Sequence, residues 1–160
     1  MRQLFRALSF GAVLTLSCSI MTLWAQAADP ASGTWELNLA KSKFTPGPAP
    51  KSMTRTIEVT GDELKYTTKG VGAEGQPTLV EFTAKYDGKD YPVTGAPDYD
   101  AVSLKRINAA TVAGSLKKSG KVVYTVRRVV SKDGTRTTIT VKGKNAKGQR
   151  VTVVQVFDKR

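Results

Sequence analysis

The chain has 160 residues, a formal net charge of +12, a single cysteine at position 18 and no histidine. Because Cys18 lies in an N-terminal apolar segment, the rest of the chain has neither a thiol nor an imidazole, which excludes disulfides, Cys/His metal sites and Ser-His-Asp or Cys-His catalysis. We therefore predict no metal site and no cofactor.

The first 27 residues have the pattern of a secretory signal peptide. Arg2 and Arg6 form a basic start, an apolar run follows from Leu8 through Leu23, and Ala25-Gln26-Ala27 is a small-x-small cleavage site. We expect cleavage after Ala27 and a periplasmic or secreted protein that does not span the membrane. The alternative is an uncleaved membrane anchor, for which the apolar run is short.

Residues 28–160 are predicted to form a single all-β domain. No helical periodicity of useful length follows the leader; short alternating runs are separated by Gly, Asp-Gly or Asn signals, which is typical of an antiparallel meander. The predicted strands are 33–39, 53–60, 63–69, 78–86, 89–93, 101–107, 110–118, 121–131, 135–143 and 149–157. We expect an up-and-down barrel of about 8–10 strands, with a two-sheet β-sandwich as the alternative.

The first predicted strand opens with Gly33-Thr34-Trp35. Alternation places Trp35, Leu37 and Leu39 on one face of it. We interpret Trp35 as a plug that closes one end of the barrel, and Gly33 as a residue whose missing side chain lets another backbone approach closely.

Glycine and aspartate mark the expected turns. Hairpins are predicted at Thr60-Gly61-Asp62, Tyr86-Asp87-Gly88-Lys89 and Lys132-Asp133-Gly134-Thr135, because Asp and Gly tolerate turn conformations. Two longer breaks, at 70–77 and 94–100, are predicted to be rim loops that control access to the interior.

Alternation also points some polar side chains into the predicted barrel, namely Arg55, Arg106, Arg128 and Gln155. An unpaired buried charge is costly, so an inward arginine needs a partner, and a ligand carboxylate or phosphate is one candidate. The alternative is that these arginines lie near a barrel end or pair with Asp90, Asp98 or Asp100.

A ligand site follows from this assignment of faces. The residues expected to form it are Trp35, Leu37, Tyr66, Phe82, Tyr124, Phe157, Arg106, Arg128 and Gln155. The apolar and aromatic members would supply most of the contact area, and Arg106 and Arg128 would orient an anionic head group. The alternative is that the aromatic residues simply fill the core.

The basic charge is concentrated in the last third of the chain. Residues 28–116 carry ten Lys/Arg against eleven Asp/Glu, whereas 117–160 carry thirteen against two. An alternative function is therefore docking of Lys117 to Arg150 on an acidic envelope surface. No aromatic-rich basic strand stands out, so we predict no nucleic-acid partner.

Enzyme activity has little support in the sequence. Asp98 and Asp100 flank Tyr99 in a loop, but adjacency in sequence does not supply the separation that paired catalytic carboxylates need. We expect a protein that is not an enzyme.

The Gly33-x-Trp35 opening, the strand meander and the closing Val154-Gln155-Val156-Phe157-Asp158-Lys159 resemble the calycin superfamily of lipocalins and fatty-acid-binding proteins. Strings within 33–48 and 84–95 also look like a group of exported bacterial lipocalin-like proteins that brings no known activity. The resemblance implies a lipocalin-like barrel that holds a small apolar ligand. The positions that match the carboxylate-gripping Arg-x-Tyr of fatty-acid-binding proteins hold Gln155 and Phe157, so the resemblance concerns the fold more than the fatty-acid function.

Overall fold

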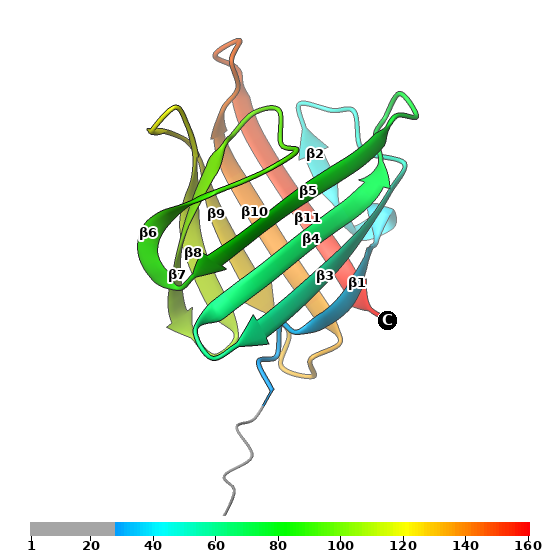
Figure 1. Ribbon diagram of the computed structural model, residues 1–160. Coiled ribbons are helices and arrows are strands. Elements are labelled where there is room, and N and C mark those ends of the chain that lie inside the picture. Colours follow the sequence, from blue (N-terminus) through cyan, green and yellow to red (C-terminus); the bar gives the residue numbers. More distant parts are fainter. Residues whose placement is uncertain (1–27) are drawn as a thin grey trace, which may run out of the picture.

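The computed structural model describes residues 28–160, which form eleven β-strands and one short 3-10 helix, η1 (Leu39–Lys41) (Figure 1). The strands are β1 (Gly33–Leu37), β2 (Lys43–Thr45), β3 (Ser52–Thr60), β4 (Glu63–Val71), β5 (Pro77–Lys85), β6 (Asp87–Pro92), β7 (Ala101–Asn108), β8 (Thr111–Lys118), β9 (Lys121–Val130), β10 (Arg136–Lys144) and β11 (Arg150–Lys159). The predicted signal peptide lies outside the described residues.

The strands form one antiparallel sheet that curls into a nearly closed barrel (Figure 1). Its order is β5-β4-β3-β1-β11-β10-β9-β8-β7-β6, and β2 pairs with β11 beside this path. The sheet closes where the N–H and C=O of Glu81 in β5 exchange hydrogen bonds of 3.0 and 2.9 Å with Thr94, two residues after the end of β6. The predicted meander barrel is therefore confirmed, and the two-sheet sandwich is excluded.

Local chemistry explains where the observed strands depart from the predicted ones. The first strand ends at Leu37 because the Asn38 side chain accepts a hydrogen bond from the backbone N–H of Lys41 and starts η1. Leu39 therefore leaves the face of Trp35 and is 42% exposed. The predicted turn at Asp87-Gly88 is instead the irregular start of β6, where the pairing with β7 shifts register.

Trp35 lies at one end of the barrel interior, which we call the closed end. Its side chain is fully buried, and its Nε1–H donates to the carbonyl of Ala31 at 2.9 Å. Gly33 is favoured by its φ of +134° and not by the predicted close backbone approach, because an added Cβ would meet only the flexible end of the Lys159 side chain, with Cε at 2.8 Å. The buried Trp35 side chain thus closes this end of the barrel, where β1 begins.

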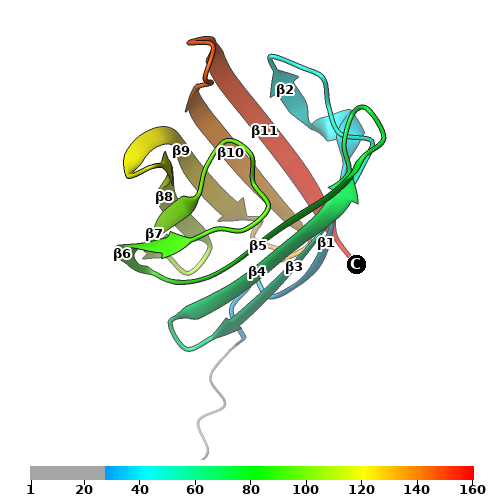
Figure 2. The ribbon, with the colours of Figure 1, turned by 45° about the horizontal axis from the view of Figure 1, so that its top comes forward.

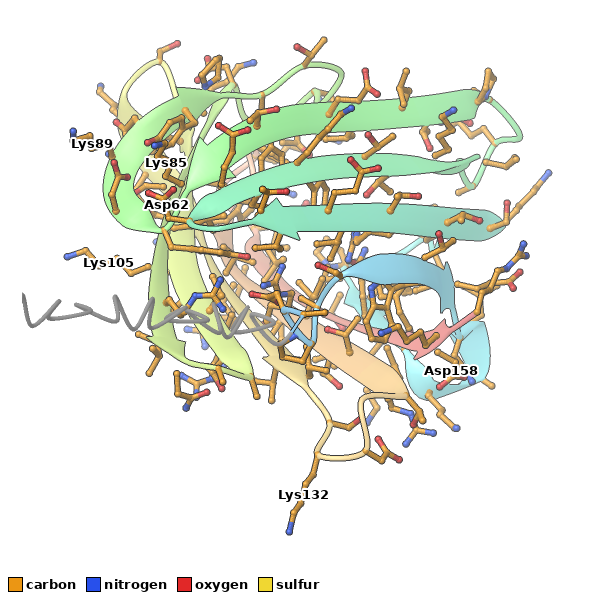
Figure 3. The ribbon with its side chains drawn as sticks, turned by 60° about the horizontal axis from the view of Figure 1, so that its bottom comes forward. Asp62, Lys85, Lys89, Lys105, Lys132 and Asp158 are labelled. Atoms are coloured by element: carbon orange, nitrogen blue, oxygen red, sulfur yellow. The ribbon has the colours of Figure 1, made fainter. Side chains whose placement is uncertain are left out.

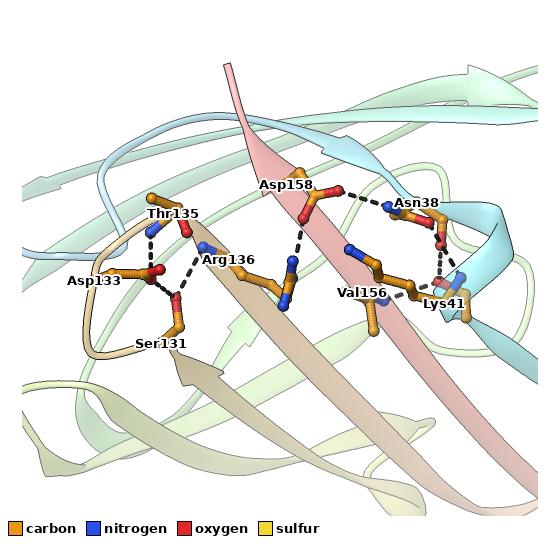
Figure 4. Close-up of polar contacts among 9 residues, drawn as sticks. Asn38, Lys41, Ser131, Asp133, Thr135, Arg136, Val156 and Asp158 are labelled. Atoms are coloured by element: carbon orange, nitrogen blue, oxygen red, sulfur yellow. Dashed lines mark hydrogen bonds and ion pairs between the residues drawn. The ribbon is translucent and has the colours of Figure 1, made fainter.

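Polar side chains fix β11 and the β9–β10 turn (Figure 4). Asp158 accepts hydrogen bonds from Nδ2 of Asn38 at 2.6 Å and from Nε of Arg136 at 3.1 Å, and these bonds lower the pKa of its carboxyl group. In the turn, the hydroxyl of Ser131 donates to Asp133, whose pKa falls to about 2 chiefly through this bond. Both carboxylates therefore stabilise the fold in their charged form.

Candidate ligand-binding site

The barrel encloses a cavity of about 510 Å³. The exposed loop residues Pro46, Pro48 and Asp98 line it at the end opposite Trp35, so the cavity reaches the surface there, and we call this end the mouth. Figure 2 shows β2 and the loop between β6 and β7 at this end of the barrel. A cavity of this size is within the range that holds small organic ligands.

The cavity walls are mostly apolar. The aliphatic residues that line it are Leu64, Val80, Val102, Leu104, Val112, Leu116, Val126, Ile139, Val141, Val151 and Val153. Tyr66 and Phe82 stack on one another with 4.4 Å between ring centroids. Strand alternation explains this lining, since one face of each strand points inward. The walls suit the hydrocarbon part of a ligand.

Arg55 is a buried cation in this apolar cavity. Its side chain is on β3, and the residue is only 4% exposed. Nε donates to Oγ1 of Thr68 at 3.1 Å and Nη2 to Oε1 of Gln155 at 3.3 Å, while Nη1 has no hydrogen-bond partner among residues 28–160. The guanidinium carbon lies 4.1 Å from the ring centroid of Phe157. Burial lowers the pKa of Arg55, and no carboxylate in the described chain pairs with it.

Arg128 is the second buried cation that lines the cavity. It is on β9 and is 7% exposed, whereas Arg127, the preceding residue, points outward and is exposed. Its Nη2 donates to the hydroxyl of Tyr86 at 3.0 Å. Its Nε is buried and has no hydrogen-bond partner within residues 28–160. Both cavity arginines therefore hold an unused N–H donor.

The two arginines share one layer of the barrel interior. Arg128, Ile139 and Gln155 are in register on β9, β10 and β11, and the guanidinium group of Arg55 reaches Gln155 from β3. The pKa of Arg55 is lowered first by burial, and the nearby charge of Arg128 lowers it further. This layer is a positively charged patch within an otherwise apolar wall, and it is suited to an oxyanion.

The loop 94–100 brings Asp98 and Tyr99 to the cavity. Burial raises the pKa of the Tyr99 hydroxyl, the nearby Tyr66 hydroxyl raises it further, and the charge of Arg55 acts in the opposite direction. Tyr99 and Arg55 line the same cavity. The loop therefore connects the mouth to the buried arginines.

Five of the nine residues expected at the ligand site line the cavity, namely Tyr66, Phe82, Tyr124, Arg128 and Gln155. The other four do not. Trp35, Leu37 and Phe157 are buried in the packing of the barrel core rather than on the cavity wall. Alternation gives the side of the strand on which a residue lies, but it does not give its depth along the barrel axis.

Arg106 is also absent from the cavity. Its Nη1 pairs with Oδ2 of Asp29 at 2.6 Å, and its guanidinium carbon lies 4.2 Å from the ring centroid of Tyr86. The partner is therefore a carboxylate, but not one of the three acidic residues considered from the sequence. Arg55 takes the place in the cavity that was expected for Arg106.

The mouth differs in part from the expected rim loops. The loop 94–100 lines the cavity, as expected, but no residue of 70–77 does. Phe44 and the proline-rich segment from Pro46 to Pro48 line it instead, because β2 pairs with β11 and carries this segment over the barrel. The only sequence signal for this wall was the stiffness of the proline-rich stretch.

Within residues 28–160, no three or more His, Cys, Asp or Glu side chains are grouped so that they could hold a metal ion. The same part of the chain contains no helix with the length and apolar character required to cross a membrane.

No protein-family model matches this chain, and no curated protein sequence matches it. Among solved structures, the chain is similar to the zebrafish ileal bile acid-binding protein crystallised with cholic acid, with a TM-score of 0.55 and 13% sequence identity. The alignment covers 82% of this chain and 99% of that chain. At this identity the similarity concerns the fold alone, which is calycin-like. The resemblance to exported bacterial proteins stays a prediction.

Proposed function

We propose that this protein is an exported carrier that binds a small amphipathic molecule, with an apolar body and an anionic head group, inside the barrel. The observation that carries the proposal is the pair of buried arginines, Arg55 and Arg128, each with an unpartnered N–H in an otherwise apolar cavity. Export rests on the leader pattern of residues 1–27.

Energetics support an anionic head group. A buried donor left without a partner costs about 1–3 kcal/mol, and an ionised acceptor recovers this cost most completely. The described chain supplies no carboxylate to either Arg55 or Arg128. A ligand carboxylate or phosphate has oxygens for both free donors, and its hydrocarbon part replaces water along the aliphatic wall.

The proposal is tested by comparing dodecanoate with dodecanol in the protein stripped of bound lipid. Both have the same chain, but only dodecanoate carries a charge, so we expect it to bind at least tenfold more tightly. Arg128→Gln should weaken dodecanoate binding by about ten- to a hundredfold, since a hydrogen bond to a charged group contributes about 1.5–3 kcal/mol. Binding of dodecanol should change by less than about twofold.

Arg127→Gln is the matched control, because Arg127 is next in sequence and exposed on the outer face of β9. It removes the same charge without touching the cavity. Displacement of a fluorescent apolar probe or calorimetry gives the affinities. Equal binding of the two ligands by the unmodified protein, or equal losses in Arg127→Gln and Arg128→Gln, would show that the arginine layer is not a head-group site.

A second candidate is docking on an acidic envelope surface. The basic side chains of the last third include Lys118, Lys121, Lys144, Lys147 and Arg150, which are exposed in the β8–β9 and β10–β11 connections or beside them. These connections lie at the mouth end. Co-sedimentation with anionic vesicles that is lost on adding salt would support docking, and its absence at low salt would exclude it.

A further inference from the structure

We infer that Asp29 is a positioning residue for the ligand site: through Arg106 and Tyr86 it holds Arg128 in the cavity. The inference rests on the proposed function for its ligand measurements, but the coupling within the protein is independent of it. Asp29 and Arg128 are 99 positions apart in the sequence, and only the closed end of the barrel brings them into one chain of contacts.

The N-terminal segment before β1 is built into the closed end. Oδ2 of Asp29 pairs with Nη1 of Arg106 at 2.6 Å, and Oδ1 accepts the backbone N–H of Ala31 at 2.8 Å. The Asp29 side chain is only 8% exposed. The hydroxyl of Ser32 accepts the N–H of Val59, which ties the same segment to β3. The carboxylate is thus held on both oxygens, and its position is set by the fold.

Tyr86 contacts both Arg106 and Arg128 and so links the Asp29–Arg106 ion pair to Arg128. The guanidinium carbon of Arg106 lies 4.2 Å from the Tyr86 ring centroid, and the Tyr86 hydroxyl accepts a hydrogen bond of 3.0 Å from Nη2 of Arg128. The Arg128 guanidinium carbon is itself 6.0 Å from the same centroid. The ring is therefore held by one cation on its face and orients the other through its hydroxyl.

Asp29 supplies the negative charge in this chain of contacts. Arg106 and Arg128 are two cations beside one ring, and Asp29 is the one acidic partner that either has among the described residues. Without it, like charges repel and Arg106, whose side chain is 31% exposed, can turn to water. Tyr86 then loses the cation on its face, and Arg128 loses its fixed acceptor.

The test compares Asp29→Asn with Asp62→Asn. Asp62 lies at the same end of the barrel and forms an exposed ion pair of 3.6 Å with Lys85 (Figure 3). Asp29→Asn should weaken dodecanoate binding by about tenfold, the lower end of what a hydrogen bond to a charged group contributes, while dodecanol binding changes by less than about twofold. Asp62→Asn should change neither affinity.

Two further measurements separate positioning from general destabilisation. In a background of Arg128→Gln, Asp29→Asn should have no additional effect on dodecanoate, because both substitutions act on the same interaction. The Nε–H resonance of Arg128 in a ¹⁵N spectrum, identified by its loss in Arg128→Gln, should shift in Asp29→Asn and stay unchanged in Asp62→Asn. If Asp29→Asn does not fold, Tyr86→Phe removes only the acceptor and should give the same selective loss.

An equal loss of dodecanoate and dodecanol binding, additivity with Arg128→Gln, or an unchanged Arg128 resonance would overturn the inference. One further result would show that the inference about Asp29 holds even where the proposed function fails. If the unmodified protein does not distinguish dodecanoate from dodecanol while the Arg128 resonance still moves in Asp29→Asn, the head-group site is wrong and the coupling from Asp29 to Arg128 stands.

Discussion

Replacing Arg55 by methionine tests whether this arginine is retained for a ligand or for the barrel itself. Arg55 is 4% exposed, has no ion-pair partner and leaves Nη1 without an acceptor. Methionine has a similar length and an apolar, flexible side chain that fills the same space. If the arginine serves a ligand, its removal should raise the stability of the empty protein and reduce selectivity for an anionic head group.

The contacts of Arg55 set the size of the effect. Removing the unpartnered N–H recovers about 1–3 kcal/mol, and exchanging buried ionic groups for apolar side chains commonly leaves a protein unchanged or about 1–4 kcal/mol more stable. Against this stands the loss of the cation–π contacts with Phe157 and Tyr66, about 1–2 kcal/mol. The acceptors Thr68 and Gln155 border the cavity, where water replaces the donor. We expect a net gain of about 1 kcal/mol.

Urea unfolding at neutral pH measures this change. With a slope of about 1–3 kcal/mol per molar urea, the midpoint should rise by about 0.5 M, and the slope itself should stay the same. Dodecanoate affinity, measured in parallel, should fall by about tenfold or more, while Arg128 retains part of the selectivity over dodecanol. A loss of more than about 1 kcal/mol in the unfolding free energy would refute the reasoning, because it would show that Arg55 is held by its contacts within the barrel.

Two other predictions concern the mouth loop and the β9–β10 turn. Gly95 has φ +83°, and an added Cβ would lie 1.9 Å from the carbonyl oxygen of Leu79, so Gly95→Ala should lower the unfolding free energy by about 2 kcal/mol or more. Gly61 has φ +62°, and an added Cβ would have no atom within 4 Å, so Gly61→Ala should lower the unfolding free energy by less. Thermal unfolding of both variants measures the difference. Because the pKa of Asp133 is lowered to about 2 in the folded protein, its charged form stabilises the fold above about pH 4, and this contribution is lost as the pH falls to 2. Asp133→Asn should therefore lower the melting temperature at pH 7 but not at pH 2; an equal loss at both pH values would contradict this.

The strands of this barrel were predictable because one face of each strand is buried and the other is exposed to solvent. On β9, for example, Tyr124 and Arg128 are buried while Arg127 is exposed, as strict alternation requires. A ten-strand meander with one apolar face per strand closes most simply into a barrel. Strand β2 was missed because three residues are too few to show a period.

The two-residue alternation of a strand does not predict how deep along the barrel axis an inward side chain lies. Arg55 and Arg106 both satisfy the alternation of their strands, yet Arg55 reaches the cavity and Arg106 stays near the closed end. Arg106 is two residues from the end of β7, and Asp29, 77 positions away, pairs with it there once the N-terminal segment has packed against the barrel. Trp35 and Phe157 were misplaced for the same reason, since inward side chains fill the core before they line a cavity.

Of the two longer breaks predicted to form the mouth, only 94–100 lines the cavity, and no residue of 70–77 does. The break at 94–100 was recognised from its glycine and proline, and it does deliver Tyr99 to the cavity. The segment from Pro46 to Pro48 lines the cavity because β2 pairs with β11, and this pairing joins residues more than 100 positions apart. The local sequence shows only that the proline-rich stretch is stiff, and not which strand it joins.

Both ends of the described chain lie at the closed end. Asp29 is fixed there by Arg106, and the backbone N–H of Arg160 donates to the carbonyl of Thr34 at 3.0 Å, while its side chain pairs with Glu36 (Figure 1). A tether, fusion partner or solid support attached through either terminus therefore leaves the opposite rim facing solvent. Immobilised copies of this barrel would all present their openings outward, which is the orientation that access to the cavity from solution requires.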